Sequence, residues 1–155
     1  MLLERIKKDL VEHLKSGDKA KISIIRLLLA ALKDKEISLR NTQDFDGILN
    51  DNVVMDIINK MIKQRNIAAK TYEDANRTDL ADKELLEAKL LSHYLPSQLT
   101  EEQLILEIEK IMLSAKAESL RDMSKVMKVL KDSFTGKCDM QLASNLVKHK
   151  LSNKA

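Results

Sequence analysis

Apolar residues recur along this chain with the period of a helix rather than that of a strand. Leu3, Ile6, Leu10 and Leu14 follow each other at three- and four-residue intervals. This spacing places them on one face of a helix, so the pattern predicts an amphipathic helix over residues 2–15.

The following segment, residues 19–39, is apolar on nearly every side. It comes after Ser16-Gly17-Asp18, where the glycine is suited to end one helix and the aspartate to cap the next. A helix that is apolar all round is buried on several sides. We therefore expect this segment to be the central helix of a bundle.

Two further helices are predicted before the single proline, Pro96. A polar stretch over residues 41–52 predicts a loop, and apolar spacing then predicts a helix from about 53 to 72. Thr78 or Asp79 can cap the next helix. That helix should end before the proline, because the residue preceding a proline avoids helical geometry.

Pro96 is also the predicted boundary between two units, residues 1–95 and 96–155. The second unit opens on a capping box, with Thr100 as N-cap and Gln103 as its partner. Three short helices should follow, at roughly 101–116, 119–133 and 139–151, the last of them capped by Asp139. The predicted fold class is all-α, with an N-terminal helical bundle followed by a small three-helix domain.

Composition supports this fold class and excludes several others. Among 155 residues there are three Gly, one Pro, two Tyr, two Phe and no Trp, which leaves too few turn-forming and aromatic residues for an all-β architecture. Cys138 is the only cysteine, so neither an intrachain disulfide nor a cysteine-based zinc site is expected. With no apolar run long enough for a bilayer and no signal-peptide pattern, we expect no membrane partner and a cytoplasmic location.

The net charge of +3 is unevenly distributed. Residues 120–155 hold eight Lys and Arg against three Asp and Glu, a net of +5, whereas residues 96–119 have a net of −3. Within the basic segment, an apolar stripe predicts the core-facing side of one helix, formed by Met123, Val126, Met127, Leu130 and Phe134. The cations of that segment fall off the stripe, and two interpretations stay open: a solvated face that keeps the helices soluble, or a phosphate-binding surface. The candidate phosphate-binding residues are Arg121, Lys125, Lys128, Lys131, Lys137 and Lys148.

Candidate catalytic residues are few. His13, His93 and His149 lie on different predicted helices, never at the spacing of a metal site, and no glycine-rich phosphate loop occurs. The carboxylates Glu84 and Glu87 are interpreted as solvated helix residues. We expect no catalytic residue, no metal and no cofactor, and whether the chain is an enzyme stays open. A second group of cations is interpreted as a solvated helix face, with a binding surface as the alternative, namely Lys60, Lys63, Arg65 and Lys70.

An ordered set of short motifs resembles the YqeY family over essentially the whole chain. The motifs are Ile25-Arg26-Leu27, Lys63-Gln64-Arg65, Asp79-Leu80-Ala81, Tyr94-Leu95-Pro96, Met123-Ser124-Lys125-Val126-Met127 and Gly136-Lys137-Cys138-Asp139. Two positions depart from the family pattern, since Ser124 and Met140 stand where glycines are expected. If those glycines allow a backbone to approach RNA closely, the two changes weaken that part of the resemblance.

The family is similar to the C-terminal tail of the B subunit of the glutamine-dependent aminoacyl-tRNA amidotransferase. The resemblance implies a tail module that contacts tRNA, while the amide-forming chemistry of that enzyme belongs to a separate domain. A label of carbon–nitrogen ligase with glutamine as amido-N-donor would thus be inherited from the full enzyme. The hypotheses are a tRNA-binding accessory module, a helical protein–protein interaction module without RNA binding, and, least favoured, an amidotransferase in its own right. The partners considered are tRNA and a protein of the translation machinery.

Overall fold

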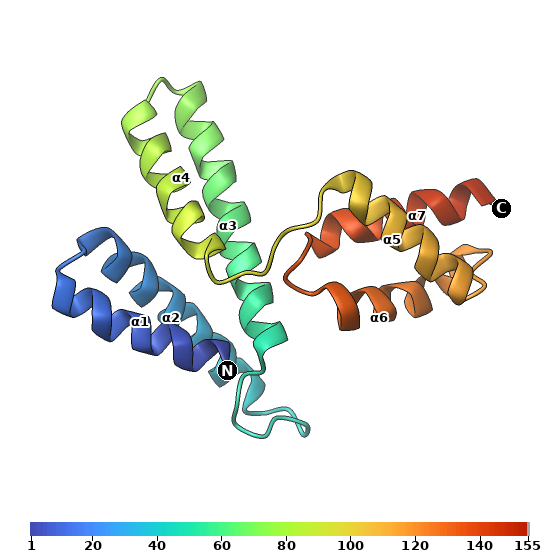
Figure 1. The fold of residues 1–155 in the computed structure, drawn as a ribbon, viewed down its shortest axis with the longest axis horizontal. Helices are drawn as coiled ribbons and strands as arrows, with labels where there is room; N and C mark the ends of the chain where they lie inside the picture. Colours follow the sequence, from blue (N-terminus) through green and yellow to red (C-terminus); the bar gives the residue numbers. More distant parts are fainter. Residues whose placement is uncertain (155) are drawn as a thin grey trace. The chain divides into compact units, whose positions relative to one another are not determined.

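The computed structural model describes residues 1–154 and confirms the all-α class. Within that range the chain forms seven α-helices and one short 3₁₀ helix (Figure 1). A single isolated β-bridge in the described residues joins Thr135 and Cys138. The chain divides into two compact units, Met1–Leu95 and Pro96–Ala155. Among the described helices, none has both the length and the apolar character needed to cross a bilayer.

The first unit contains helices α1 (Leu2–Ser16), α2 (Lys19–Leu39), α3 (Asp51–Asp74) and α4 (Thr78–Ser92). The turn between α1 and α2 forms as the sequence predicts. Gly17 takes a left-handed φ of 73°, which ends α1, and the Asp18 carboxylate accepts the Lys21 N–H at 3.2 Å, which caps α2. These local signals therefore fix where α1 ends and α2 begins.

Helix α2 contacts α1, α3 and α4, as expected of a central helix. Ile24, Ile25, Leu28 and Leu32 are each no more than 2% exposed. Leu27, however, remains 48% exposed. The apolar pattern predicts that α2 is buried on nearly every side. Its three neighbouring helices leave the side that holds Leu27 open to solvent.

The start of α4 differs from the prediction. Neither Thr78 nor Asp79 provides a side-chain cap, because the helix already begins at Thr78 and Arg77 occupies the N-cap position. The Asp79 carboxylate instead pairs with the Arg77 guanidinium at 3.2 Å. At the other end α4 stops at Ser92, and Tyr94 turns back into the core of the unit.

The second unit contains α5 (Glu101–Ser114), the 3₁₀ helix η1 (Leu120–Asp122), α6 (Met123–Phe134) and α7 (Met140–Lys154). The capping box at the start of α5 is confirmed, with the Gln103 N–H donating to Thr100 Oγ1 and the Thr100 N–H to Gln103 Oε1. The Asp139 carboxylate accepts the Gln141 N–H at 2.9 Å, as its predicted cap role requires.

The turn between α6 and α7 is anchored to the segment that precedes α5. The Leu99 N–H donates to the Lys137 carbonyl at 2.7 Å, and the Gln98 side-chain amide donates to the Gly136 carbonyl. Gly136 has a φ of 83°, a left-handed conformation that favours glycine. The turn that presents Lys137 is consequently held by two hydrogen bonds from the segment that precedes α5.

Candidate functional site

Helix α6 is amphipathic in the way the sequence predicts. Val126 and Leu130 are fully buried, and Met123, Met127 and Phe134 pack partly buried against the core of the second unit. The stripe fixes the rotation of the helix, so its remaining side chains face solvent. Arg121, Lys125, Lys128 and Lys131 are all exposed.

The four cations do not form one narrow row. Successive positions three residues apart rotate by about 60° around a helix, so Lys125, Lys128 and Lys131 spread over about a third of its circumference. Lys128 and Lys131 line a shallow surface depression of about 690 Å³. Ser124 lines it with them, and so does the carboxylate residue Asp132.

Lys125 is outside this depression and lies near a carboxylate. Its ammonium is 3.7 Å from Asp122 Oδ1, and the Lys125 side chain is 72% exposed. The backbone N–H groups of Glu118 and Ser119 both donate to the Asp122 carboxylate. These bonds, with a smaller contribution from Lys125, hold the pKa of Asp122 below its ordinary value. Asp122 therefore stays ionised and offsets part of the Lys125 charge.

Lys137 lies in the anchored turn after α6. Its ammonium is 5.8 Å from the centre of the Phe134 ring, within the range of a cation–π contact. The side chain is exposed, while its own carbonyl accepts the Leu99 N–H. The turn thus presents a cation whose backbone is fixed.

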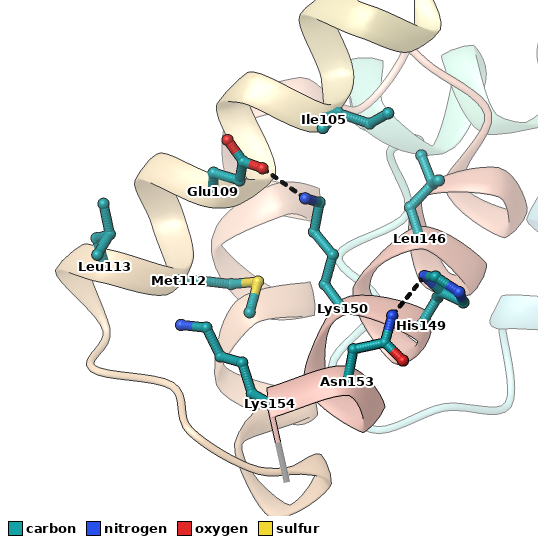
Figure 2. A pocket seen from close by; sticks show the side chains of 9 residues that line it. All are labelled: Ile105, Glu109, Met112, Leu113, Leu146, His149, Lys150, Asn153 and Lys154. Carbon is teal, nitrogen blue, oxygen red and sulfur yellow. Dashed lines mark hydrogen bonds and ion pairs between the residues drawn. The ribbon is translucent and has the colours of Figure 1, made fainter.

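The lysines of α7 separate onto different sides of that helix. Lys150 reaches across to Glu109 on α5 and lines a groove between the two helices (Figure 2). Lys148 is exposed and does not line the groove. Two residues correspond to about 200° of rotation, so Lys148 and Lys150 face nearly opposite directions. Lys150 therefore has a carboxylate partner that spacing along the sequence does not reveal.

The groove between α5 and α7 combines apolar and polar side chains. Met112 lies inside it, and Leu113, at its margin, is 74% exposed (Figure 2). His149 and Asn153 form a 3.4 Å contact along α7. The cavity measures about 600 Å³.

The two positions that depart from the family glycines have ordinary helical conformations. Ser124 lies in the first turn of α6, and Met140 is the first residue of α7. The residues with positive φ in the second unit are Lys116 and Gly136. A non-glycine residue at positions 124 and 140 hence causes no backbone strain.

Cys138 is a core residue rather than an activated nucleophile. It is 4% exposed, and its Sγ lies 3.8 Å from the Phe134 carbonyl. Burial, followed by the nearby charge of Asp139, raises the pKa of the Cys138 thiol above its ordinary value. No group of three or more His, Cys, Asp and Glu side chains suited to hold a metal ion occurs in residues 1–154.

Two relationships in the first unit were missed by sequence reasoning. Glu87, interpreted as solvated, is largely shielded and accepts a hydrogen bond from Arg65, which corrects the solvated interpretation of both residues. His13 and His93, distant in sequence, line one pocket. Neither relationship leaves a periodic signal, because the partners are on different helices.

Curated proteins with similar sequences carry a mitochondrial name. The protein called altered inheritance of mitochondria protein 41, mitochondrial, is 38% identical over 92 residues in Vanderwaltozyma polyspora, covering 59% of this chain and 47% of that protein. Its counterpart in Eremothecium gossypii is 34% identical over 93 residues, covering 60% and 48%. In Candida glabrata it is 31% identical over 90 residues, covering 58% and 47%. The matched part of the chain spans about half the length of these relatives.

These names correct the expectation of a cytoplasmic location. The relatives are described as mitochondrial, which conflicts with a purely cytoplasmic assignment. The expectation rested on a missing targeting pattern. Targeting segments are removed and form no part of a folded core, so the sequence of the folded part carries little information on location.

The family relationship extends over almost the whole chain. The family model described as Yqey-like protein matches residues 3–151. This range covers nearly all of both units, including the anchored turn, α6 and most of α7. The chain belongs to the YqeY-like family.

Proposed function

We propose that the chain is an accessory module that binds tRNA through the cationic surface of its second unit. Phosphates would be contacted by Arg121, Lys125, Lys128, Lys131, Lys137 and Lys148. The main observation that supports this proposal is that all six side chains are exposed, while the apolar stripe of α6 packs into the core. Exposed cations on a folded surface attract a polyanion through charge and through the release of its counterions.

Recognition would depend on RNA shape and phosphates rather than on unstacked bases. Phe134, the aromatic residue of the second unit, packs partly buried against its core. Base-specific binding of single strands normally uses exposed aromatic side chains as stacking platforms. A folded RNA that presents phosphates at fixed positions suits this surface better.

The proposed relationship to tRNA-dependent amidotransferases concerns binding and not chemistry. The buried thiol of Cys138 has a raised pKa, which opposes a role as nucleophile. We therefore assign no amide-forming step to this chain. Any ligase chemistry would come from a partner of the translation machinery.

Fluorescence anisotropy tests the proposal directly. Purified full chain is titrated into labelled total tRNA at two salt concentrations, with a DNA duplex as a polyanionic control. The triple variant Lys128→Ala/Lys131→Ala/Lys137→Ala should bind tRNA more weakly. The slope of log K against log salt should become less steep by about three units, one for each lysine removed.

A matched triple variant separates this surface from net charge. Lys8→Ala/Lys15→Ala/Lys83→Ala removes the same charge from exposed positions of the first unit. It should leave the affinity for tRNA nearly unchanged. Equal losses in the two variants, or equal binding of tRNA and duplex, would contradict the proposal.

Docking of a protein partner is the second candidate function, and the groove between α5 and α7 favours it. Leu113 is the most exposed of the large apolar residues in the described chain. A protein-binding module would show salt-tolerant affinity dominated by apolar contacts. Leu113→Ser would then abolish binding of the partner and leave tRNA affinity intact.

A further inference from the structure

A pocket in the first unit is bordered by α1, α2 and the end of α4. It measures about 220 Å³. Its floor is apolar, with Ile24 and Leu91 each 1–2% exposed. Arg5, Asp9 and His13 enter it from α1 at four-residue spacing, which places all three on one face of that helix.

Tyr94 fixes the geometry of this pocket. Its side chain is in the core of the unit, and its hydroxyl donates to Asp9 Oδ2 at 2.8 Å across 85 residues of sequence. The Arg5 guanidinium lies 5.4 Å from the centre of the same ring. The Asp9 carboxylate is thereby oriented by the ring that Arg5 covers, and a carboxylate has a second oxygen with which to accept hydrogen bonds.

Other side chains around the pocket provide hydrogen-bond donors. Lys21 projects from the first turn of α2, 3.2 Å from Asp18, and His13 and His93 line the same space. An ammonium and imidazole N–H groups are donors suited to a carboxylate. The pocket therefore combines one acidic acceptor, several donors and an apolar floor.

We propose that this pocket binds a small apolar α-amino acid. The ammonium group of the ligand would donate to Asp9, its carboxylate would accept from Lys21 and the two histidines, and its side chain would cover Ile24. The volume is below the range of about 300–1,000 Å³ found for drug-sized ligands, so a nucleotide would not fit. A zwitterion uses both charges of the site, whereas a simple anion would place a carboxylate close to Asp9.

Titration with L-leucine tests this proposal, monitored by ¹H–¹⁵N NMR of the full chain. Two analogues share the branched side chain, since 4-methylpentanoate lacks the ammonium and isoamylamine lacks the carboxylate. Leucine should shift amides around Asp9, Lys21 and Tyr94. Each analogue should bind at least about tenfold more weakly, because each loses one charged hydrogen-bonding group.

Substitutions then assign the two ends of the ligand. Asp9→Asn keeps an oxygen acceptor for the Tyr94 hydroxyl but removes the charge, and it should weaken leucine about tenfold while sparing 4-methylpentanoate. Lys21→Gln should weaken both ligands. Glu12→Gln, an exposed position on α1, is the charge-matched control and should weaken neither.

Several results would overturn the proposal. These are the absence of leucine-induced shifts up to its solubility limit, equal binding of leucine and 4-methylpentanoate, and shifts confined to residues 96–154. The NMR spectrum of each variant also reports whether it is folded, so a loss of binding by a folded Asp9→Asn chain is interpretable. A folded Asp9→Asn variant with unchanged leucine affinity would exclude the assigned role of Asp9.

Discussion

The Arg65 guanidinium on α3 donates from Nε to Glu87 Oε2 on α4 at 3.0 Å, and both side chains are only about one-seventh exposed, at 13% and 14%. Arg65 also donates from a terminal nitrogen to the Met61 carbonyl at 3.3 Å. The pair thus joins the two helices of a hairpin along a stretch where small residues, Ala69, Ala81 and Ala88, are buried. Small side chains let the helices approach each other closely, and the shielded ion pair connects them along this stretch.

Removal of Glu87 should destabilise the first unit. Glu87→Ala leaves a shielded guanidinium without its counter-charge, and the free energy of unfolding should fall by about 2–4 kcal/mol. Equilibrium urea unfolding followed by circular dichroism measures the change. The exposed pair of Asp56 and Lys60, at 3.5 Å, provides the control, and Asp56→Ala should cost less than about 1 kcal/mol. Equal losses of unfolding free energy in the two variants would show that shielding from solvent does not strengthen the Arg65–Glu87 pair.

The contrast between local and distant contacts explains what the sequence predicts. The Asp18 cap and the Thr100–Gln103 box depend on residues within three positions of each other, and both are confirmed. The partners of Arg65 and Tyr94 lie 22 and 85 residues away. Periodicity identifies which face of a helix is buried, but it does not identify the residue that faces it from another helix.

The capping box at the start of α5 gives a test in the second unit. Thr100→Ala removes the side-chain acceptor of the Gln103 N–H and should lower the free energy of unfolding by about 1 kcal/mol. Thermal unfolding followed by circular dichroism measures this change. Thr100→Ser, which keeps the hydroxyl, should retain most of the stability. A loss with serine as large as that with alanine would assign the effect to the methyl group rather than to the cap.

Tyr94 predicts how stability changes at alkaline pH. Burial, and then the hydrogen bond to Asp9, raises the pKa of Tyr94 well above its ordinary value. The unfolded chain releases this proton near pH 10 while the native chain retains it, so the unfolded state binds fewer protons and stability falls as pH rises. The contribution is fully present below about pH 10, and its loss above that pH approaches 1.4 kcal/mol per pH unit.

Tyr94→Phe isolates this contribution. The variant should lose about 1 kcal/mol at neutral pH, for the missing hydrogen bond, and show a flatter decline of stability above pH 10. Urea unfolding at pH values from 7 to about 11 compares the variant with the parent chain, and their lysine titrations cancel in the difference. Parallel curves for the parent chain and the variant would mean that the hydroxyl is not kept protonated by the fold.

The candidate RNA surface was predictable in its outline and not in its detail. The apolar stripe of α6 determines that Lys128 and Lys131 face solvent, and this needs nothing beyond helical spacing. That Lys150 pairs with Glu109 instead depends on how α5 packs against α7. The same limit applies to Ser124, whose place beside Lys128 in one depression appears only in the folded unit.

Unequal contributions of the lysines of α6 provide the last prediction. Lys128 lines the depression, whereas the Lys125 ammonium lies 3.7 Å from an Asp122 carboxylate that stays ionised. Under the proposed function, Lys128→Ala should reduce the salt slope of tRNA binding by about one unit, and Lys125→Ala by less.

In the Asp122→Asn background, Lys125 loses its nearby negative charge. Lys125→Ala should then reduce the slope by the full unit. Anisotropy titrations over a series of salt concentrations give the slopes of the parent chain, the three single variants and the double variant. Identical effects of Lys125→Ala in both backgrounds would show that Asp122 does not reduce the contribution of Lys125 to binding. Any difference between the lysines would then depend on where the RNA phosphates lie rather than on the fold of the protein.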